Sequence, residues 1–92
     1  MTKINVVCGA RLLKALANEK RLEIVFYLAH RELKVHELGQ LVGLGQSALS
    51  QHLAILRAEN IVKTRRVAQN IFYSVGNENA IKIVKLLEEI YS

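Results

Sequence analysis

One face of the helix predicted over Gln46 to Ala58 gathers amide and hydroxyl side chains and has no carboxylate. At 100° per residue, these positions fall on one side of a helix. They are Gln46, Ser47, Ser50, Gln51, Ala54 and Arg57. Glutamine can make two hydrogen bonds to adenine, serine can donate or accept one, and no carboxylate repels phosphate. This chemistry predicts a surface that reads base edges in the major groove of double-stranded DNA.

The alternative interpretation of this face is an ordinary solvated helix surface. Solvated helices usually carry Glu and Lys, which stabilise the helix at i,i+4 spacing, whereas Gln and Ser are poorer helix formers on balance. No acidic residue occurs from Gly43 to Ala58, so we favour the DNA-binding interpretation. We expect the opposite, apolar side of the helix to be buried. That side carries Leu49, Leu53 and Leu56.

A basic β-hairpin is predicted to follow this helix. The hydrophobic period changes to that of strands at Ile61 to Val67 and Ile71 to Val75, joined across Ala68-Gln69-Asn70. A basic ribbon beside a helix–turn–helix can follow phosphates or enter the minor groove, although basic residues also protect sheet edges from aggregation. Because the cluster adjoins the polar helix, we favour DNA contacts. The predicted contacts are Lys63, Arg65, Arg66, Gln69 and Asn70.

Helical periods surround these two segments. The expected helices run from Ile4 to Ala17, from the N-cap Asn18 to about His30, from Val35 to Val42, and from Asn77 to Tyr91. In the third of them we expect Leu38, Leu41 and Val42 to be buried. The turn Gly43-Leu44-Gly45 contains two residues that tolerate positive φ. The order helix, helix, helix–turn–helix, hairpin, helix predicts a mostly α fold with a β-hairpin, a winged helix-turn-helix.

The composition is that of a small, basic, apolar-rich protein. The 92 residues are 51% hydrophobic and carry a net charge of +5. We expect one winged-helix DNA-binding domain over residues 1–92. The lone Cys8 excludes an intramolecular disulfide and fits a reducing cytoplasm. The sequence has no long apolar run of the kind that forms a signal peptide or a membrane span. We therefore expect a cytoplasmic protein without membrane contacts.

The first and last helices carry more apolar residues than one packing partner needs. On the last helix they span over half the circumference, whereas burial against one neighbour needs a stripe of about 100°. This surplus predicts a homodimer through both helices, and a two-fold dimer would place two DNA-reading helices about 34 Å apart. The predicted interface residues are Val6, Ala10, Leu13, Val84, Leu87 and Tyr91.

A resemblance to a known family rests on LLKALANEKRLEIVFYL (Leu12–Leu28) and ELKVHELGQLVGLGQSALSQHLAILRAENIVKTRRVAQNIFYSV (Glu32–Val75). The most specific part is QSALSQHL, followed by Leu56-Arg57. These stretches resemble the ArsR/SmtB family, in its NolR/HlyU/BigR-like subgroup. The resemblance implies a winged-helix homodimer that recognises a palindromic operator, and we expect it to act as a repressor. His52 matches a family histidine, and two interpretations stay open for it: DNA contact or half-buried packing.

The family's sensing sites are missing from this sequence. Lys34 and His36 stand where its third-helix metal site has two cysteines, and Lys cannot act as a soft thiolate ligand. The segment Asn77 to Ser92 has no Asp or His for the last-helix metal site. Phe26 and Ser92 stand where related dithiol sensors have cysteines. We therefore expect neither a metal nor a cofactor.

Two alternatives to DNA-binding repression stay open. The winged helix could instead bind proteins, or activate transcription by displacing a silencer. An enzyme is not expected, because the sequence has no nucleophile–base pair, Gly-rich phosphate loop or carboxylate pair, and His30, His36 and His52 lie in different segments. For Cys8 we favour a small buried hydrophobe over an intersubunit cross-link or an oxidant sensor.

Overall fold

The computed structural model describes residues 4–92, so residues 1–3 of the predicted domain lie outside the described part. The elements in chain order are α1 (Val6–Leu16), α2 (Glu19–His30), β1 (Leu33–Lys34), α3 (Val35–Val42), α4 (Gln46–Ala58), β2 (Val62–Val67), β3 (Asn70–Val75) and α5 (Glu78–Tyr91). The predicted mostly α fold with a β-hairpin is confirmed. The strand β1 was not predicted.

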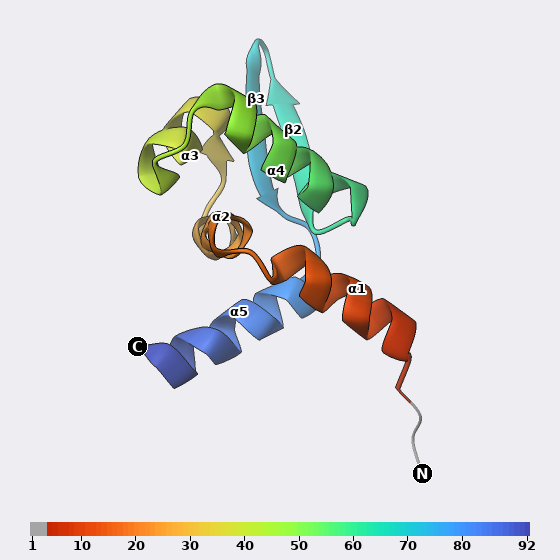
Figure 1. Cartoon of the computed structure of the whole chain (residues 1–92). Helices are drawn as coiled ribbons and strands as arrows, with labels where there is room; N and C mark the ends of the chain where they lie inside the picture. The colour runs from red at the N-terminus through yellow and green to blue at the C-terminus, as the bar shows by residue number, and fades with distance from the viewer. Residues whose placement is uncertain (1–3) are drawn as a thin grey trace.

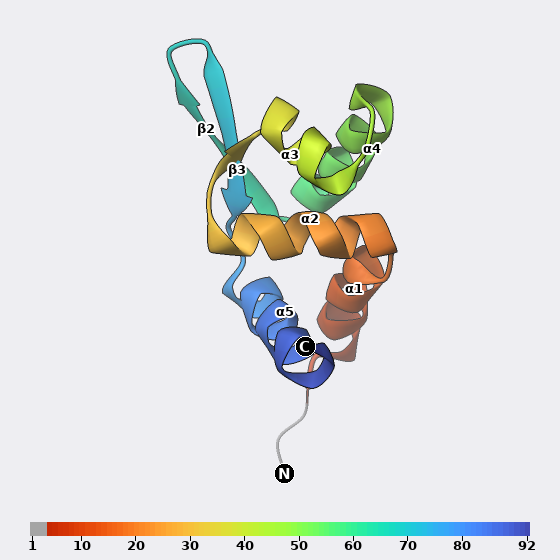
Figure 2. The ribbon, with the colours of Figure 1, turned by 90° about the vertical axis from the view of Figure 1, so that its left-hand side faces the viewer.

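Helix α2 lies between two layers of the molecule. On one side of it lie α3, α4 and the β2–β3 hairpin, whose tip projects beyond the helices (Figure 1). On the other side lie α1 and α5 (Figure 2). The three strands form an antiparallel sheet in the order β1-β3-β2. The layer that contains the polar helix is therefore separate from the layer that contains the two apolar-rich helices.

Asparagine side chains cap the N-termini of three of the five helices. Asn5 Oδ1 accepts a hydrogen bond of 3.0 Å from the backbone N of Cys8 at the start of α1. Asn18 Oδ1 accepts two at the start of α2, of 3.0 and 3.1 Å. Asn77 Oδ1 accepts two at the start of α5, of 2.9 and 3.2 Å. Each cap satisfies backbone N–H groups that have no partner within the helix, which confirms the predicted start of α2.

The two turns differ in detail from the prediction. Gly43 has a φ of 68°, but Gly45 has a φ of −70° and acts as the N-cap of α4, so only one glycine needs the left-handed region. At the hairpin, Asn70 already pairs with Val67, and Ala68 adopts a φ of 55°. The hairpin loop is therefore two residues, Ala68 and Gln69, because Asn70 belongs to β3.

The core runs through both layers of the molecule. The predicted apolar side of α4 is confirmed, since Leu49, Leu53 and Leu56 are all buried. Leu38 and Val42 of α3 are buried with them, but Leu41 is 38% exposed, so its predicted burial is wrong. Leu41 directly precedes Val42, and consecutive helix positions point 100° apart. Over residues 4–92, no helix is both long and apolar enough to cross a bilayer.

Gly39 allows α3 and α4 to approach each other closely. A Cβ at this position would lie 3.2 Å from the backbone oxygen of Leu44 and 3.3 Å from Cδ2 of Leu49. We expect Gly39→Ala to destabilise the protein, because overpacking costs about 1–3 kcal/mol and the gain in helix propensity is at most about 1 kcal/mol. The control is Gln40→Ala, an exposed position on the same helix. Urea unfolding that ranks both variants as equally stable would contradict this constraint.

Candidate nucleic-acid interface

The polar face of α4 is exposed along the helix. All six predicted residues of this face are exposed: Gln46, Ser47, Ser50, Gln51, Ala54 and Arg57. No acidic residue lies in the first turn, and the N-cap Gly45 offers no side-chain hydrogen bond. The first backbone N–H groups of α4 therefore keep their positive partial charge unneutralised by a side-chain cap, which favours a nearby phosphate.

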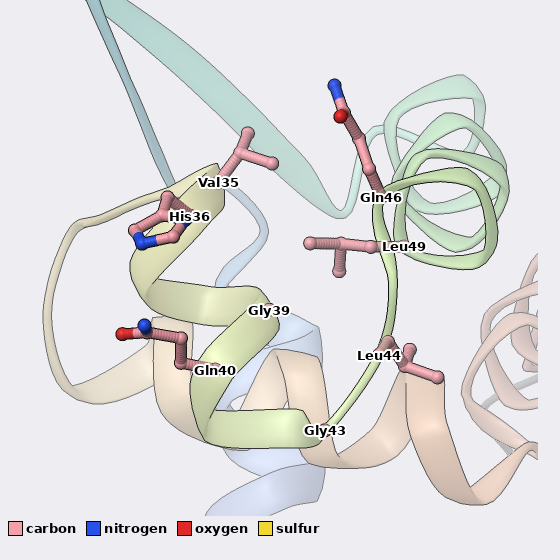
Figure 3. Close-up of a pocket in the computed structure, with 8 residues that line it drawn as sticks. All are labelled: Val35, His36, Gly39, Gln40, Gly43, Leu44, Gln46 and Leu49. Carbon is pink, nitrogen blue, oxygen red and sulfur yellow. The ribbon is translucent and has the colours of Figure 1, made fainter.

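A groove of about 550 Å³ separates α3 from the start of α4. Its polar lining residues are His36 and Gln40 on α3 and Gln46 on α4. Figure 3 shows Leu49 pointing from α4 towards α3, whereas the Gln46 side chain extends away from both Leu49 and Leu44. Because Leu49 is buried and Gln46 is exposed, the first turn of α4 is fixed by its apolar side and leaves its amide free.

A second groove, of about 390 Å³, lies between α4 and the sheet. Ser50 and Arg57 line it from α4, and Tyr73 lines it from β3. Tyr73 was not among the predicted contacts. Strand alternation and the pairing of Tyr73 with Thr64 would have placed it on the same face of the hairpin as Arg66. This face of the hairpin and the polar face of α4 therefore border one groove.

The two adjacent arginines of β2 lie on opposite faces of the hairpin. Arg66 pairs with Ile71, and Arg65 pairs with Phe72. Successive side chains of a strand alternate between faces, so Arg65 shares the outer face with Lys63, whereas Arg66 shares the groove face. The structure thus separates two residues that the sequence had grouped as one basic cluster. Gln69 and Asn70 remain exposed at the tip.

Arg65 is occupied by a contact within the chain. Its Nε and Nη2 donate hydrogen bonds of 3.0 and 2.8 Å to the two carboxylate oxygens of Glu32. Its guanidinium also lies 5.1 Å from the ring centre of Phe72. The hydrogen bond from Arg65 lowers the pKa of Glu32 below its ordinary value, and the same bond raises the pKa of Arg65. The carboxylate is therefore ionised at neutral pH.

His52 is half-buried on α4. Within residues 4–92, its Nδ1 is buried and has no hydrogen-bond partner. At 100° per residue, His52 lies beside Leu56 and Ala48 around the helix, on the flank of the buried side that faces away from the centre of the polar face. This placement favours the packing interpretation of His52, and its contact with DNA stays a prediction.

The layer formed by α1 and α5 exposes apolar side chains. Val6 is 66% exposed, Leu13 is 57% exposed and Tyr91 is 83% exposed, whereas Leu87 is half-buried. The prediction that Val84 lies at the dimer interface is wrong, because Val84 is only 2% exposed and belongs to the chain's own core. Exposed apolar residues beyond the predicted set extend the same surface. They are Ile4, Val7, Leu86 and Ile90.

Two further features of α1 are the exposure of Cys8 and an ion pair of Arg11. Cys8 is exposed, so the expectation that it is a buried hydrophobe is wrong within the single chain. Arg11 donates hydrogen bonds of 3.1 and 3.2 Å to the carboxylate of Glu59, the C-cap of α4. This pair joins the apolar-rich helix directly to the end of the polar helix.

The sequence of this chain matches a known family of proteins and several of its members. Residues 18–64 match the family model described as bacterial regulatory protein, arsR family. The nodulation protein NolR of Rhizobium meliloti is 51% identical over 83 residues, which are 90% of this chain and 68% of that protein. The transcriptional activator HlyU of Vibrio cholerae is 48% identical over 80 residues, which are 87% of this chain and 74% of that protein.

Solved structures support the same assignment. The structure of HlyU from Vibrio cholerae matches with a TM-score of 0.91 and 43% identity, and covers 98% of both chains. A homodimeric winged helix-turn-helix DNA-binding domain from Mycobacterium bovis matches with a TM-score of 0.82 and 28% identity, over 92% of this chain and 79% of that chain. The predicted winged-helix fold and family resemblance are confirmed. The chain belongs to the arsR family of bacterial regulatory proteins and is a transcriptional regulator rather than an enzyme.

Proposed function

We propose that the protein is a homodimeric, sequence-specific repressor that binds a palindromic operator through α4 and the β2–β3 hairpin. The observation that carries this proposal is the exposed face of α4, which offers amide and hydroxyl groups and no carboxylate. A helix with such a face suits the major groove, where donors and acceptors distinguish all four base pairs. The adjoining hairpin supplies positive charge beside it.

The proposed contacts divide into base-reading and phosphate-binding groups. Residues near the start of α4 read base edges, because the N-terminal part of a recognition helix reaches deepest into the groove. They are Gln46, Ser47, Ser50 and Gln51. Phosphate and sugar contacts come from the end of α4 and from the hairpin. These residues are Arg57, Lys63, Arg66, Gln69 and Asn70.

A second copy of the chain covers the exposed apolar layer in this proposal. Val6, Ala10 and Leu13 of α1 and Leu87 and Tyr91 of α5 form the interface. Burial of this surface would remove apolar area from water, the main driving force of association. A two-fold axis through this layer places two α4 helices about one DNA turn apart, near 34 Å, so that the operator has matching half-sites.

Repression follows directly from occupancy of the operator. A dimer that covers a promoter excludes polymerase without any further contact. A second candidate is activation by displacement of a silencer, because the relative HlyU is named a transcriptional activator. A promoter–reporter fusion with the gene deleted distinguishes the two. Increased expression after deletion supports repression, and decreased expression supports activation.

Gln51→Ala tests the base-reading role of α4. The operator is first selected from random duplexes, and the variant is then titrated against the selected and a scrambled sequence. We expect affinity for the operator to fall by about 1–3 kcal/mol for each half-site, the discrimination given by one good bidentate base contact. Affinity for the scrambled duplex should not change, because backbone charge dominates that binding.

The matched control is Asn79→Ala, which removes an exposed amide from α5 on the opposite layer. This variant should bind both duplexes like the wild type. A folded Gln51→Ala variant with wild-type operator affinity would remove Gln51 from the set of base-reading residues.

A further inference from the structure

We propose that Glu32 and Arg65 brace the β2–β3 hairpin, so that Arg65 is a positioning residue for DNA binding and not a phosphate ligand. The inference rests on the proposed function and assigns a structural role to a contact at the middle of the β2–β3 hairpin. Glu32 lies between α2 and β1, and Arg65 lies on β2. The contact therefore connects the hairpin to the segment that leaves α2.

The brace crosses the whole sheet. The strand order is β1-β3-β2, so the residues before β1 and those of β2 are separated by β3. The Arg65 side chain passes over Phe72 of β3, 5.1 Å from the ring centre, and ends on Glu32 beside β1. Cation–π contact and the bidentate pair hold the planar guanidinium in one orientation.

The pair acts at the middle of the hairpin, between its base at Val62 and Val75 and its tip. The short strand β1 pairs with β3 through only Leu33 with Tyr73 and Lys34 with Phe72. The hairpin tip projects beyond the helices, as Figure 1 shows, so a small tilt of the hairpin displaces the tip. The Glu32–Arg65 pair adds a third connection next to these two, and so fixes the position from which Arg66 and Gln69 meet DNA.

The charges argue against a second role for Arg65 at phosphate. Both oxygens of Glu32 are occupied by Arg65, and the pair is neutral as a whole. If the Arg65 guanidinium moved to a phosphate, the ionised Glu32 would be left unpaired at the outer face of the hairpin. Because a neutral pair releases no counterion from DNA, Arg65 should make no contribution to the salt dependence of binding.

The test compares Arg65→Lys, Arg65→Ala and Arg66→Ala in the full chain. Affinity for the selected operator and for a random duplex is measured over a range of salt concentrations. Arg66→Ala should reduce the slope of log K against log salt by about 0.9 per subunit. Arg65→Ala should keep the slope and lower operator affinity about two- to fivefold, the scale of an exposed ion pair. Arg65→Lys should resemble Arg65→Ala, because Lys keeps the charge but cannot form the planar, bidentate pair.

The charge-exchanged double variant Glu32→Arg with Arg65→Glu should regain operator affinity relative to Arg65→Glu alone. A separate readout without DNA is amide hydrogen exchange, which should become faster in β2 and β3 of Glu32→Gln and Arg65→Lys. Unchanged exchange would overturn the brace even if DNA binding is confirmed. A reduced salt slope in Arg65→Ala, together with wild-type behaviour of Arg65→Lys, would instead make Arg65 a phosphate ligand. Faster exchange in a protein that binds no DNA would keep the brace and remove the proposed function.

Discussion

Leu53→Ala is expected to destabilise the fold by about 2–5 kcal/mol, the cost of a cavity left by a truncated core leucine. Leu53 is only 3% exposed and lies in the middle of the buried side of α4. Urea unfolding at a fixed protein concentration measures this loss, because the stability of a dimer depends on concentration. Operator binding should fall only as far as the folded fraction falls.

The matched control for Leu53→Ala is Ser50→Ala. Ser50 lies on the exposed face of the same helix, and Ala is the better helix former, so the stability of this variant should be close to that of the wild type. A loss of under about 1 kcal/mol for Leu53→Ala would contradict the assignment of this side of α4 to the core.

Leu13→Glu should convert the proposed dimer into a monomer. Leu13 is 57% exposed on α1, so the substitution leaves the single chain's core intact and places a charge in the apolar interface. Affinity for the palindromic operator should then fall by about 10²–10⁴-fold, because linked binding of two half-sites is lost. Sedimentation velocity measures the oligomeric state, and titration of the operator measures the affinity.

The control for the dimer is Leu41→Glu, which introduces the same charge at an exposed apolar residue of α3 in the other layer. This variant should sediment like the wild type. A Leu13→Glu variant that remains a dimer would show that α1 does not form the interface through Leu13.

The sequence predicted the elements whose patterns are long enough to repeat. The bounds of α3 and α4 agree with the prediction, because α4 combines a buried leucine stripe with an acid-free face, and α3 ends at a glycine in the left-handed region. The strand β1 was missed because it has two residues, too few to show a period of two. Its position depends on pairing with β3, a contact remote in sequence.

The residue types of the candidate site were predicted from the sequence, but the directions in which their side chains point were predicted less well. The exposed face of α4 follows from helical geometry alone. The distinct directions of Arg65 and Arg66 depend on strand alternation, and the occupation of Arg65 by Glu32 depends on a contact between residues far apart in the chain. The burial of Val84 similarly depends on the rotation of α5 against α2, because the apolar belt of α5 covers more than one side.

The most direct test of sequence-specific DNA binding is the affinity ratio between the selected operator and a scrambled duplex of the same length and composition. The measurement uses the wild-type protein at a fixed, near-physiological salt concentration, since backbone charge alone binds any sequence. We expect the operator to be bound at least about 10³-fold more tightly. A ratio close to one, measured for folded protein, would contradict it.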